Sequence, residues 1–271
     1  MVEMNPRMLV TQTTCPMPDG RRLQVMTAGD MDVTLVIIHG YIDSWLSFGR
    51  MLPFLLPDYG AILPDQRGHG ATGGTEDGYT VDDFVGDAIA LMENMAGKPV
   101  HLIGHSLGAI IAHRVASARP DLLKSITLIG GAVSSMGNAT LSATYRDLAG
   151  LDDPIPYDFA YDFQKGTAFQ PLDEAVLRAY VDESMKVKAK VWKEALLGLT
   201  EDVHIPGEAP AIPALILWGA HDEIFPLEDQ LRLRAWMPDA RVINYDDLGH
   251  APQWEDPARV SADIRAFIQS L

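Results

Sequence analysis

The sequence is poor in cysteine and in basic residues. Cys15 is the only cysteine among the 271 residues, so an intrachain disulfide is impossible and we expect a reducing compartment. Lys and Arg together number 21 against 37 Asp and Glu, which gives a formal net charge of −16. A surface this acidic argues against nucleic acid, anionic membranes and polyanionic substrates as partners.

Long apolar runs and cofactor motifs are also missing. No run approaches the length of a membrane span, and the first stretch, MVEMNPRMLVTQTT, holds nothing that resembles a signal sequence. The sequence contains no phosphate loop, no strand followed by Gly-x-Gly-x-x-Gly, and no metal-ligand spacing among its eight histidines. We therefore expect a cytoplasmic protein that acts on a small molecule, without cofactor or metal; the oligomeric state is left open.

Short apolar runs alternate with longer amphipathic segments. The runs, which are rich in β-branched residues, predict buried strands at 33–38, 61–63, 100–103, 125–129, 214–218 and 241–245. Apolar residues at a spacing of 3.6 predict helices over 81–92, 107–115 and 260–271. This alternation predicts a mainly parallel sheet with helices on both faces. Two β-like runs around Met17-Pro18-Asp19-Gly20 add an antiparallel hairpin at one edge.

The alternation stops between about Val133 and Ala209. This stretch is rich in aromatic residues, has helical candidates around 141–148 and 173–199, and contains no convincing buried strand. It predicts a helical insertion that covers one end of the sheet. The expected division is a core of residues 1–133 and 209–271 and a helical cap of residues 134–208.

Residues 104–108 read Gly-His-Ser-Leu-Gly and stand between a predicted strand and a predicted helix. A serine hydroxyl becomes a nucleophile only if it is exposed, has a base within reach and has donors for the developing oxyanion. A tight turn with glycines two places to either side exposes Ser106 and directs the N–H of Leu107 toward that oxyanion. Ser106 is therefore the predicted nucleophile.

An acid and a base are expected after later strands, in that order. Asp222 lies in the loop after 214–218, and His250 lies in the loop after the last strand, so both would reach the carboxyl edge of the sheet. His250 is the predicted base and Asp222 the acid that orients it. The weaker alternatives are His221 and His105 for the base, His105 being expected to pack and to point away from the site, and three carboxylates for the acid: Glu223, Asp246 and Asp247.

The loop after 33–38 reads His-Gly-Tyr-Ile-Asp-Ser-Trp. Gly40 would let this loop pass close to Ser106, which makes the N–H of Tyr41 the second predicted oxyanion donor. His39 is expected to hold the loop by hydrogen bonding. The segment Asp65–Gly70 is interpreted as a structural turn, in which Asp65 and Arg67 pair locally.

Taken together, these segments resemble the α/β-hydrolase superfamily, and in particular its capped esterase and lactonase-like members. The resemblance implies an eight-stranded sheet and a helical lid over Ser106, and it assigns the catalytic roles to Ser106, Asp222 and His250 and the oxyanion roles to Tyr41 and Leu107. Because position 106 is serine, the carboxylate-nucleophile chemistry of epoxide hydrolases and haloalkane dehalogenases is excluded. Serine points instead to attack on an acyl carbon.

The substrate is inferred from the predicted pocket lining. Apolar and aromatic side chains suit a medium-sized, uncharged ester or lactone. The candidate substrate-binding residues are Tyr41, Ile42, Trp45, Phe225 and Ala251 from the core and Trp192 from the cap. Two alternatives stay open. One is a hydrolase of carbon–carbon bonds in β-diketone-like carboxylates, favoured if Arg146, Lys165 or Arg178 faces inward. The other is a ligand-binding protein with slow turnover.

Overall fold

A computed structural model describes residues 10–29, 32–56, 58–202 and 207–271. Eight strands form one sheet in the order β1-β2-β4-β3-β5-β6-β7-β8. The strands are β1 (Val10–Pro16), β2 (Arg22–Ala28), β3 (Thr34–Ile38), β4 (Gly60–Pro64), β5 (Val100–His105), β6 (Leu123–Ile129), β7 (Ala214–Gly219) and β8 (Arg241–Tyr245). The pairs from β4 to β8 are parallel, whereas β2 is antiparallel to both β1 and β4. The predicted parallel sheet and the predicted edge hairpin are both confirmed.

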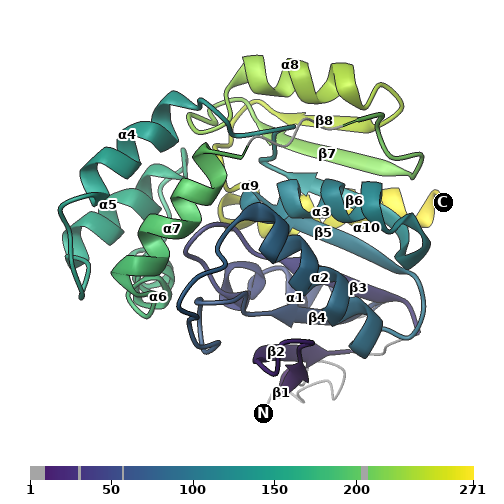
Figure 1. Ribbon diagram of the computed structural model, residues 1–271. Coiled ribbons are helices and arrows are strands. Elements are labelled where there is room, and N and C mark those ends of the chain that lie inside the picture. Colours follow the sequence, from purple (N-terminus) through teal and green to yellow (C-terminus); the bar gives the residue numbers. More distant parts are fainter. Residues whose placement is uncertain (1–9, 30–31, 57, 203–206) are drawn as a thin grey trace, which may run out of the picture.

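Helices pack on both faces of this sheet because its central strands are apolar on both sides. Val36 and Ile38 of β3 belong to the core shared with α2 (Val81–Met95), α3 (Leu107–Ala118) and α8 (Leu227–Trp236). Leu35 and Ile37 belong to the opposite core, shared with α1 (Leu52–Leu55) and α10 (Pro257–Gln269). Figure 1 shows α2 and α3 in front of the strands and α10 behind them.

Four helices occupy the stretch between β6 and β7. They are α4 (Ala139–Leu148), α5 (Tyr157–Gly166), α6 (Glu174–Ser184) and α7 (Ala189–Thr200), and none of the residues described between β6 and β7 belongs to a strand. Figure 1 shows these four helices grouped together at one end of the sheet. Their arrangement agrees with a helical insertion, although the boundaries 134–208 of a separate cap stay a prediction.

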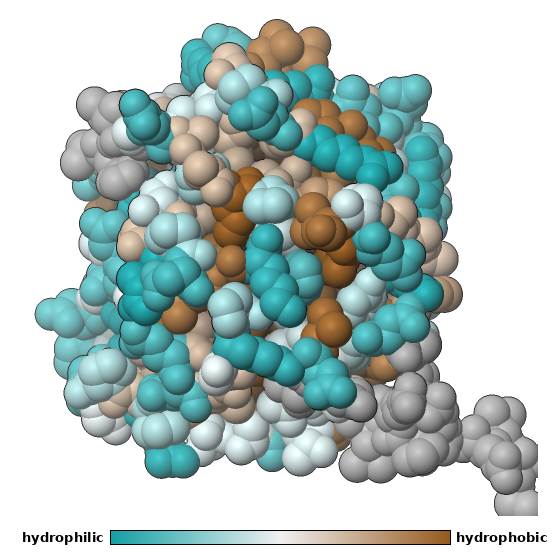
Figure 2. Space-filling model, turned by 90° about the vertical axis from the view of Figure 1, so that its right-hand side faces the viewer, coloured by the Kyte–Doolittle hydropathy of each residue, from teal (hydrophilic) through white to brown (hydrophobic). Residues whose placement is uncertain are grey.

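The opposite end of the molecule carries a mixed surface. Figure 2 shows hydrophilic and hydrophobic side chains interspersed on the face that points away from the four helices. Within the described ranges, no helix has both the length and the apolar character needed to cross a bilayer.

Helix α2 is fixed at its start by a capping box and along its length by a buried ion pair. The Thr80 side chain accepts from the N–H of Asp83, and the Asp83 carboxylate accepts from the N–H of Thr80. One turn further on, both carboxylate oxygens of Asp87 accept from Arg67, at 2.6 and 2.7 Å, and Arg21 donates to the same carboxylate at 2.8 Å. The hairpin and the loop after β4 are thereby tied to α2.

The expected pairing of Asp65 with Arg67 is therefore wrong. The Asp65 carboxylate is occupied by two backbone groups, because it accepts from the N–H of Trp45 at 2.9 Å and from the N–H of Ala71 at 2.8 Å. Gly70 packs directly on this carboxylate, since a Cβ there would lie 2.3 Å from Asp65 Cγ. The turn is structural, as expected, but each of its two charged residues anchors a different neighbour.

We expect Asp87→Asn to lower the free energy of unfolding by about 3 kcal/mol, because it removes the buried counter-charge of the Arg67 guanidinium and leaves only the more distant Asp83 carboxylate, 3.5 Å away. The matched control is Glu93→Gln, which removes an exposed partner of Arg119 and should change stability by less than about 0.5 kcal/mol. Urea unfolding followed by circular dichroism measures both. Equal effects of the two substitutions would contradict a structural role for the buried pair.

Candidate active site

Ser106 occupies a strained turn between β5 and α3. Its backbone has φ 54° and ψ −116°, a region that residues with a side chain rarely adopt. The turn is fixed by the N–H of Ser106, which donates to the carbonyl of Ile129 at 2.9 Å. Among the described residues other than glycine, Ile42 alone shares a positive φ, and it lies in the loop after β3. The predicted strand–turn–helix context of Ser106 is present.

The two glycines that flank Ser106 are required by close backbone packing. A Cβ on Gly104 would lie 2.0 Å from the carbonyl oxygen of Gly108, and a Cβ on Gly108 would lie 2.3 Å from the carbonyl oxygen of Ile38. Helix α3 therefore begins in direct contact with the ends of β3 and β5. Larger residues at either position would push the helix away and release the turn.

Asp222 and His250 form a buried hydrogen-bonded pair. His250 Nδ1 donates to Asp222 Oδ2 at 2.9 Å, and the other carboxylate oxygen accepts from the N–H groups of Ile224 and Phe225 at 2.9 and 2.8 Å. The His250 side chain is 3% exposed and that of Asp222 is fully buried. With one oxygen held by the backbone, the carboxylate has a fixed orientation, and it fixes the imidazole in turn.

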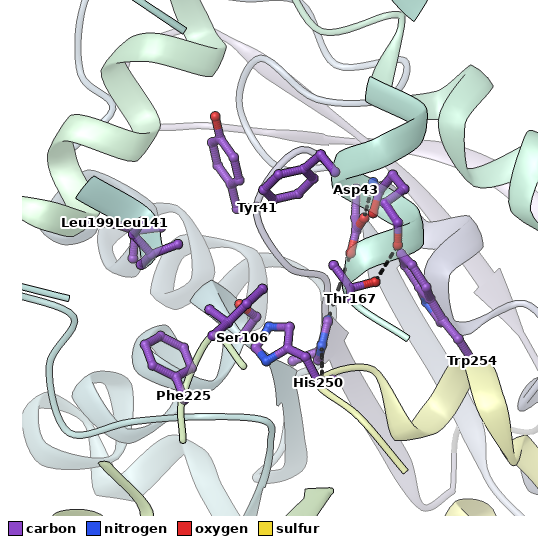
Figure 3. Close-up of a pocket in the computed structure, with 13 residues that line it drawn as sticks. Tyr41, Asp43, Ser106, Leu141, Thr167, Leu199, Phe225, His250 and Trp254 are labelled. Atoms are coloured by element: carbon purple, nitrogen blue, oxygen red, sulfur yellow. Dashed lines mark hydrogen bonds and ion pairs between the residues drawn. The ribbon is translucent and has the colours of Figure 1, made fainter. Parts of the chain in front are cut away.

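Ser106 and His250 line a common cavity that is partly open to solvent. Figure 3 shows three apolar side chains on one side of them, from Leu141, Leu199 and Phe225. On the other side it shows Asp43, Thr167 and Trp254. The cavity therefore has an apolar half and a polar half, with Ser106 between them.

The loop after β3 lies against Ser106. A Cβ on Gly40 would lie 3.3 Å from Ser106 Cβ, so only glycine lets the backbone pass this closely. Neither the N–H of Tyr41, in this loop, nor that of Leu107 donates a hydrogen bond to any described residue. Two such backbone donors next to a serine can receive the negative charge that develops on an attacked carbonyl oxygen.

His39 holds this loop, as expected. Its Nε2 accepts from the N–H of Gln66 at 3.0 Å and its Nδ1 donates to the carbonyl of Gly40 at 2.8 Å. Burial lowers the pKa of His39 to about 4, so the ring is neutral and can accept at Nε2. Its role is structural.

A sequence model of the family described as the alpha/beta hydrolase fold matches residues 33–257. The chain belongs to this family. The fold is the α/β-hydrolase fold, and the protein is a hydrolase. No group of three or more His, Cys, Asp or Glu within the described ranges is arranged to hold a metal ion.

Three similar proteins illustrate the range of the family. An uncharacterised hydrolase, YugF from Bacillus subtilis, is 25% identical over 254 residues, which cover 87% of this chain and 90% of the relative. A 2-hydroxy-6-oxononadienedioate/2-hydroxy-6-oxononatrienedioate hydrolase from Pseudomonas putida is 26% identical over 264 residues, 89% of each chain. The solved structure of an esterase from Exiguobacterium antarcticum superposes with a TM-score of 0.85 at 17% identity, covering 96% of this chain and all of that one.

Two of the six predicted substrate-binding residues of this hydrolase line the cavity, namely Tyr41 and Phe225. The other four pack elsewhere. Ile42 lies in the main core, Trp45 packs at the edge of the opposite core, and Ala251 packs with Tyr180 and Trp254. Trp192 is fully buried, and its carbonyl accepts from the Tyr41 hydroxyl at 2.6 Å, so it joins α7 to the loop after β3.

The weaker candidates for base and acid lie apart from this cavity, except His105. His221 is exposed and stacks on Phe169, with ring centroids 3.5 Å apart. Glu223, Asp246 and Asp247 are exposed as well. The expectation that His105 points away from the site was wrong: it lines the same cavity, and its Nε2 donates to the carbonyl of His250 at 3.0 Å. It is buried and packed, as expected, but next to the base.

Sequence reasoning missed the polar half of the cavity, which is lined by Asp43, Gln164 and Thr167. The only signal for Asp43 was its place two residues after Tyr41, in a loop already expected to approach Ser106. Gln164 and Thr167 follow from how α5 packs on the core, for which the sequence contains no local pattern.

We expect Gly104→Ala to destabilise the protein by several kcal/mol or to prevent folding, because a methyl group cannot fit 2.0 Å from the Gly108 carbonyl oxygen. Gly86→Ala is the control. Gly86 lies exposed in α2 with open space around it, so alanine there should add up to about 1 kcal/mol of stability. Urea unfolding measures both variants, and a stable Gly104→Ala protein would show that the turn is not sterically fixed.

Proposed function

We propose that this protein is a serine hydrolase that cleaves a carboxylic ester or lactone through an acyl-enzyme. The observation that carries the proposal is the Asp222–His250 hydrogen bond, buried beside a cavity that Ser106 and His250 line together. Strain at Ser106 supports it, because strained backbone is concentrated at functional sites.

In the proposed reaction, the Ser106 hydroxyl attacks the carbonyl carbon while His250 accepts its proton. Asp222 keeps the proton on His250 Nδ1, which leaves Nε2 free to act as the base, and it stabilises the imidazolium that forms. The N–H groups of Tyr41 and Leu107 stabilise the oxyanion. His250 returns the proton to the departing alcohol, and it then activates a water molecule that hydrolyses the acyl-enzyme.

The charge of the cavity favours an ester over a carbon–carbon substrate that carries a carboxylate. Among the described residues, no Lys or Arg lines the cavity, whereas the carboxylate of Asp43 does. The three cap cations named in the sequence analysis are engaged elsewhere or exposed. Arg178 pairs with Glu174, Lys165 lies over the Tyr161 ring, and Arg146 is exposed. An anionic substrate would meet like charge and no partner.

The helices α4–α7 are the proposed lid over this site. Leu141 of α4, Gln164 of α5 and Leu199 of α7 supply part of the cavity wall. They exclude water from the reacting atoms, which strengthens the electrostatic interactions of the oxyanion donors.

We expect Ser106→Ala and His250→Ala each to lower kcat on p-nitrophenyl butanoate by at least about 10³-fold, because each removes a group that takes part in proton transfer. His221→Ala is the matched histidine control and should keep most of the activity, since His221 is exposed beside Phe169. Turnover by folded Ser106→Ala would refute the assignment of Ser106 as the nucleophile. Ligand-induced thermal shifts without turnover by the wild type would indicate a binding protein instead.

We also expect kcat/KM for short uncharged esters and lactones to exceed that for dienoate ketones by at least about 100-fold, because the carboxylate of the ketones faces Asp43 without a cation. Parallel assays of ester hydrolysis and of loss of dienoate absorbance measure the ratio. Equal or faster cleavage of the ketones would favour the carbon–carbon hydrolase.

A further inference from the structure

The backbone around His250 is held from two sides. His105 Nε2 donates to the carbonyl of His250 at 3.0 Å, which links the loop to the turn after β5. The N–H of Ala251 donates to the carbonyl of Thr167 at 3.0 Å. Thr167 directly follows α5, in the part of the chain proposed as the lid. The peptide groups of the predicted base therefore contact both the core and the proposed lid.

Glu255 ends the short helix α9 (Pro252–Glu255), and its carboxylate accepts from three backbone N–H groups. Its Oε1 accepts from the N–H of Gly249 at 2.7 Å. Its Oε2 accepts from the N–H of Phe169 at 3.1 Å and from that of Gln170 at 2.6 Å. One carboxylate thus bridges the loop of the predicted base and the segment between α5 and α6.

The two backbones that Glu255 bridges also pack directly on each other. A Cβ on Gly249 would lie 2.7 Å from the backbone nitrogen of Phe169 and 3.2 Å from Glu255 Oε1. Glycine at this position lets both come close enough for one carboxylate to reach them. A further hydrogen bond joins the same parts, because Gln170 Nε2 donates to the carbonyl of Asp247 at 3.0 Å.

Glu255 is itself held in place by its neighbour. Trp254 is 1% exposed, and its Nε1 donates to Ser47 Oγ at 2.8 Å. The N–H of Glu255 donates to the carbonyl of Ala251 at 3.3 Å. Figure 3 shows Trp254 and Thr167 on the same side of the cavity. The carboxylate is therefore a fixed point to which the two backbones are attached.

We propose that Glu255 is a positioning residue for His250 and acts by tying its loop to segment 167–170; the proposal rests on the hydrolase proposed above. Glu255 does not line the cavity, so its effect passes through the N–H of Gly249. Proton transfer from Ser106 requires the imidazole in the correct place, and a displacement of about 1 Å can cost about 10²-fold in rate. The proposed lid thereby helps to orient the base as well as to exclude water.

Glu255→Gln keeps the size of the side chain but cannot form the bridge. A carboxylate accepts at both oxygens, whereas an amide has one acceptor oxygen and an NH2 group that only donates. Whichever way the amide turns, its NH2 group faces backbone N–H groups. Either the bond to Gly249 or the bonds to segment 167–170 are therefore lost.

Hydrogen exchange of backbone amides, followed by NMR without substrate, tests the bridge. In the wild type, the amides of Gly249, Phe169 and Gln170 should exchange at least about tenfold more slowly than in an unstructured peptide, although the last two side chains are exposed. In Glu255→Gln, one side of the bridge should exchange at least about tenfold faster, with β5 unchanged. Unprotected amides in the wild type, or unchanged exchange in the folded variant, would overturn the proposal.

Steady-state kinetics test the effect on His250. With p-nitrophenyl butanoate, Glu255→Gln should lower kcat at least about tenfold and change KM less than about threefold, because the base is displaced while the cavity lining is intact. Glu228→Gln is the matched control, since it removes an exposed carboxylate from α8 and should leave both constants unchanged. Wild-type kcat in Glu255→Gln, or a change in KM alone, would refute the positioning role.

Glu255→Asp separates the reach of the side chain from its charge. The variant keeps a carboxylate but is one methylene group shorter, so it cannot contact both backbones at once and should lose kcat as Glu255→Gln does. Full activity of Glu255→Asp would show that negative charge near His250 is sufficient, and would overturn the bridge.

The two proposals can fail separately. If folded Ser106→Ala still hydrolyses the ester, the hydrolase mechanism fails, whatever the amides of the bridge show. If the ester is hydrolysed through Ser106 and Glu255→Gln keeps the kcat of the wild type, only the positioning role fails.

Discussion

The structure depends on how closely three backbone segments approach Ser106. The loop after β3, the turn after β5 and the start of α3 meet without intervening side chains, because Gly40, Gly104 and Gly108 leave no Cβ in the way. This contact fixes Ser106 at a positive φ and brings the backbone of Gly40, which precedes Tyr41, close to it. Close packing thereby stabilises a backbone conformation that would be unfavourable alone.

Glycines also allow close backbone contact where the loop that contains His250 meets the sheet. Gly130 has φ 51°, and a Cβ on Gly130 would lie 2.5 Å from the carbonyl oxygen of His250. A Cβ on Gly219 would lie 2.1 Å from the carbonyl oxygen of Gly249. These loops approach the ends of β6 and β7 as tightly as α3 approaches β3. Four of the eight strands thus end in glycine-mediated contacts that position Ser106 or His250.

The elements and the main site residues could be predicted because their signals are local. Apolar runs marked the central strands, and the glycines around Ser106 marked the turn. Loops at the carboxyl ends of parallel strands brought Asp222 and His250 together over 28 positions. The partner of Arg67, the orientation of His105 and the polar wall from Gln164 and Thr167 depend on packing between distant elements. The catalytic and binding roles of the site residues stay predictions, as does the division of the chain into core and cap.

The hydrogen bond between the Tyr41 hydroxyl and the Trp192 carbonyl connects the proposed lid to the loop after β3. The residue whose N–H would stabilise the oxyanion is thereby anchored through its side chain to α7. If α7 moves outward to admit a substrate, it must either break this bond or draw Tyr41 along. If Tyr41 has the proposed role, stabilisation of the oxyanion depends on α7 being closed over the core, and an open molecule would be a poor catalyst even with Ser106 accessible.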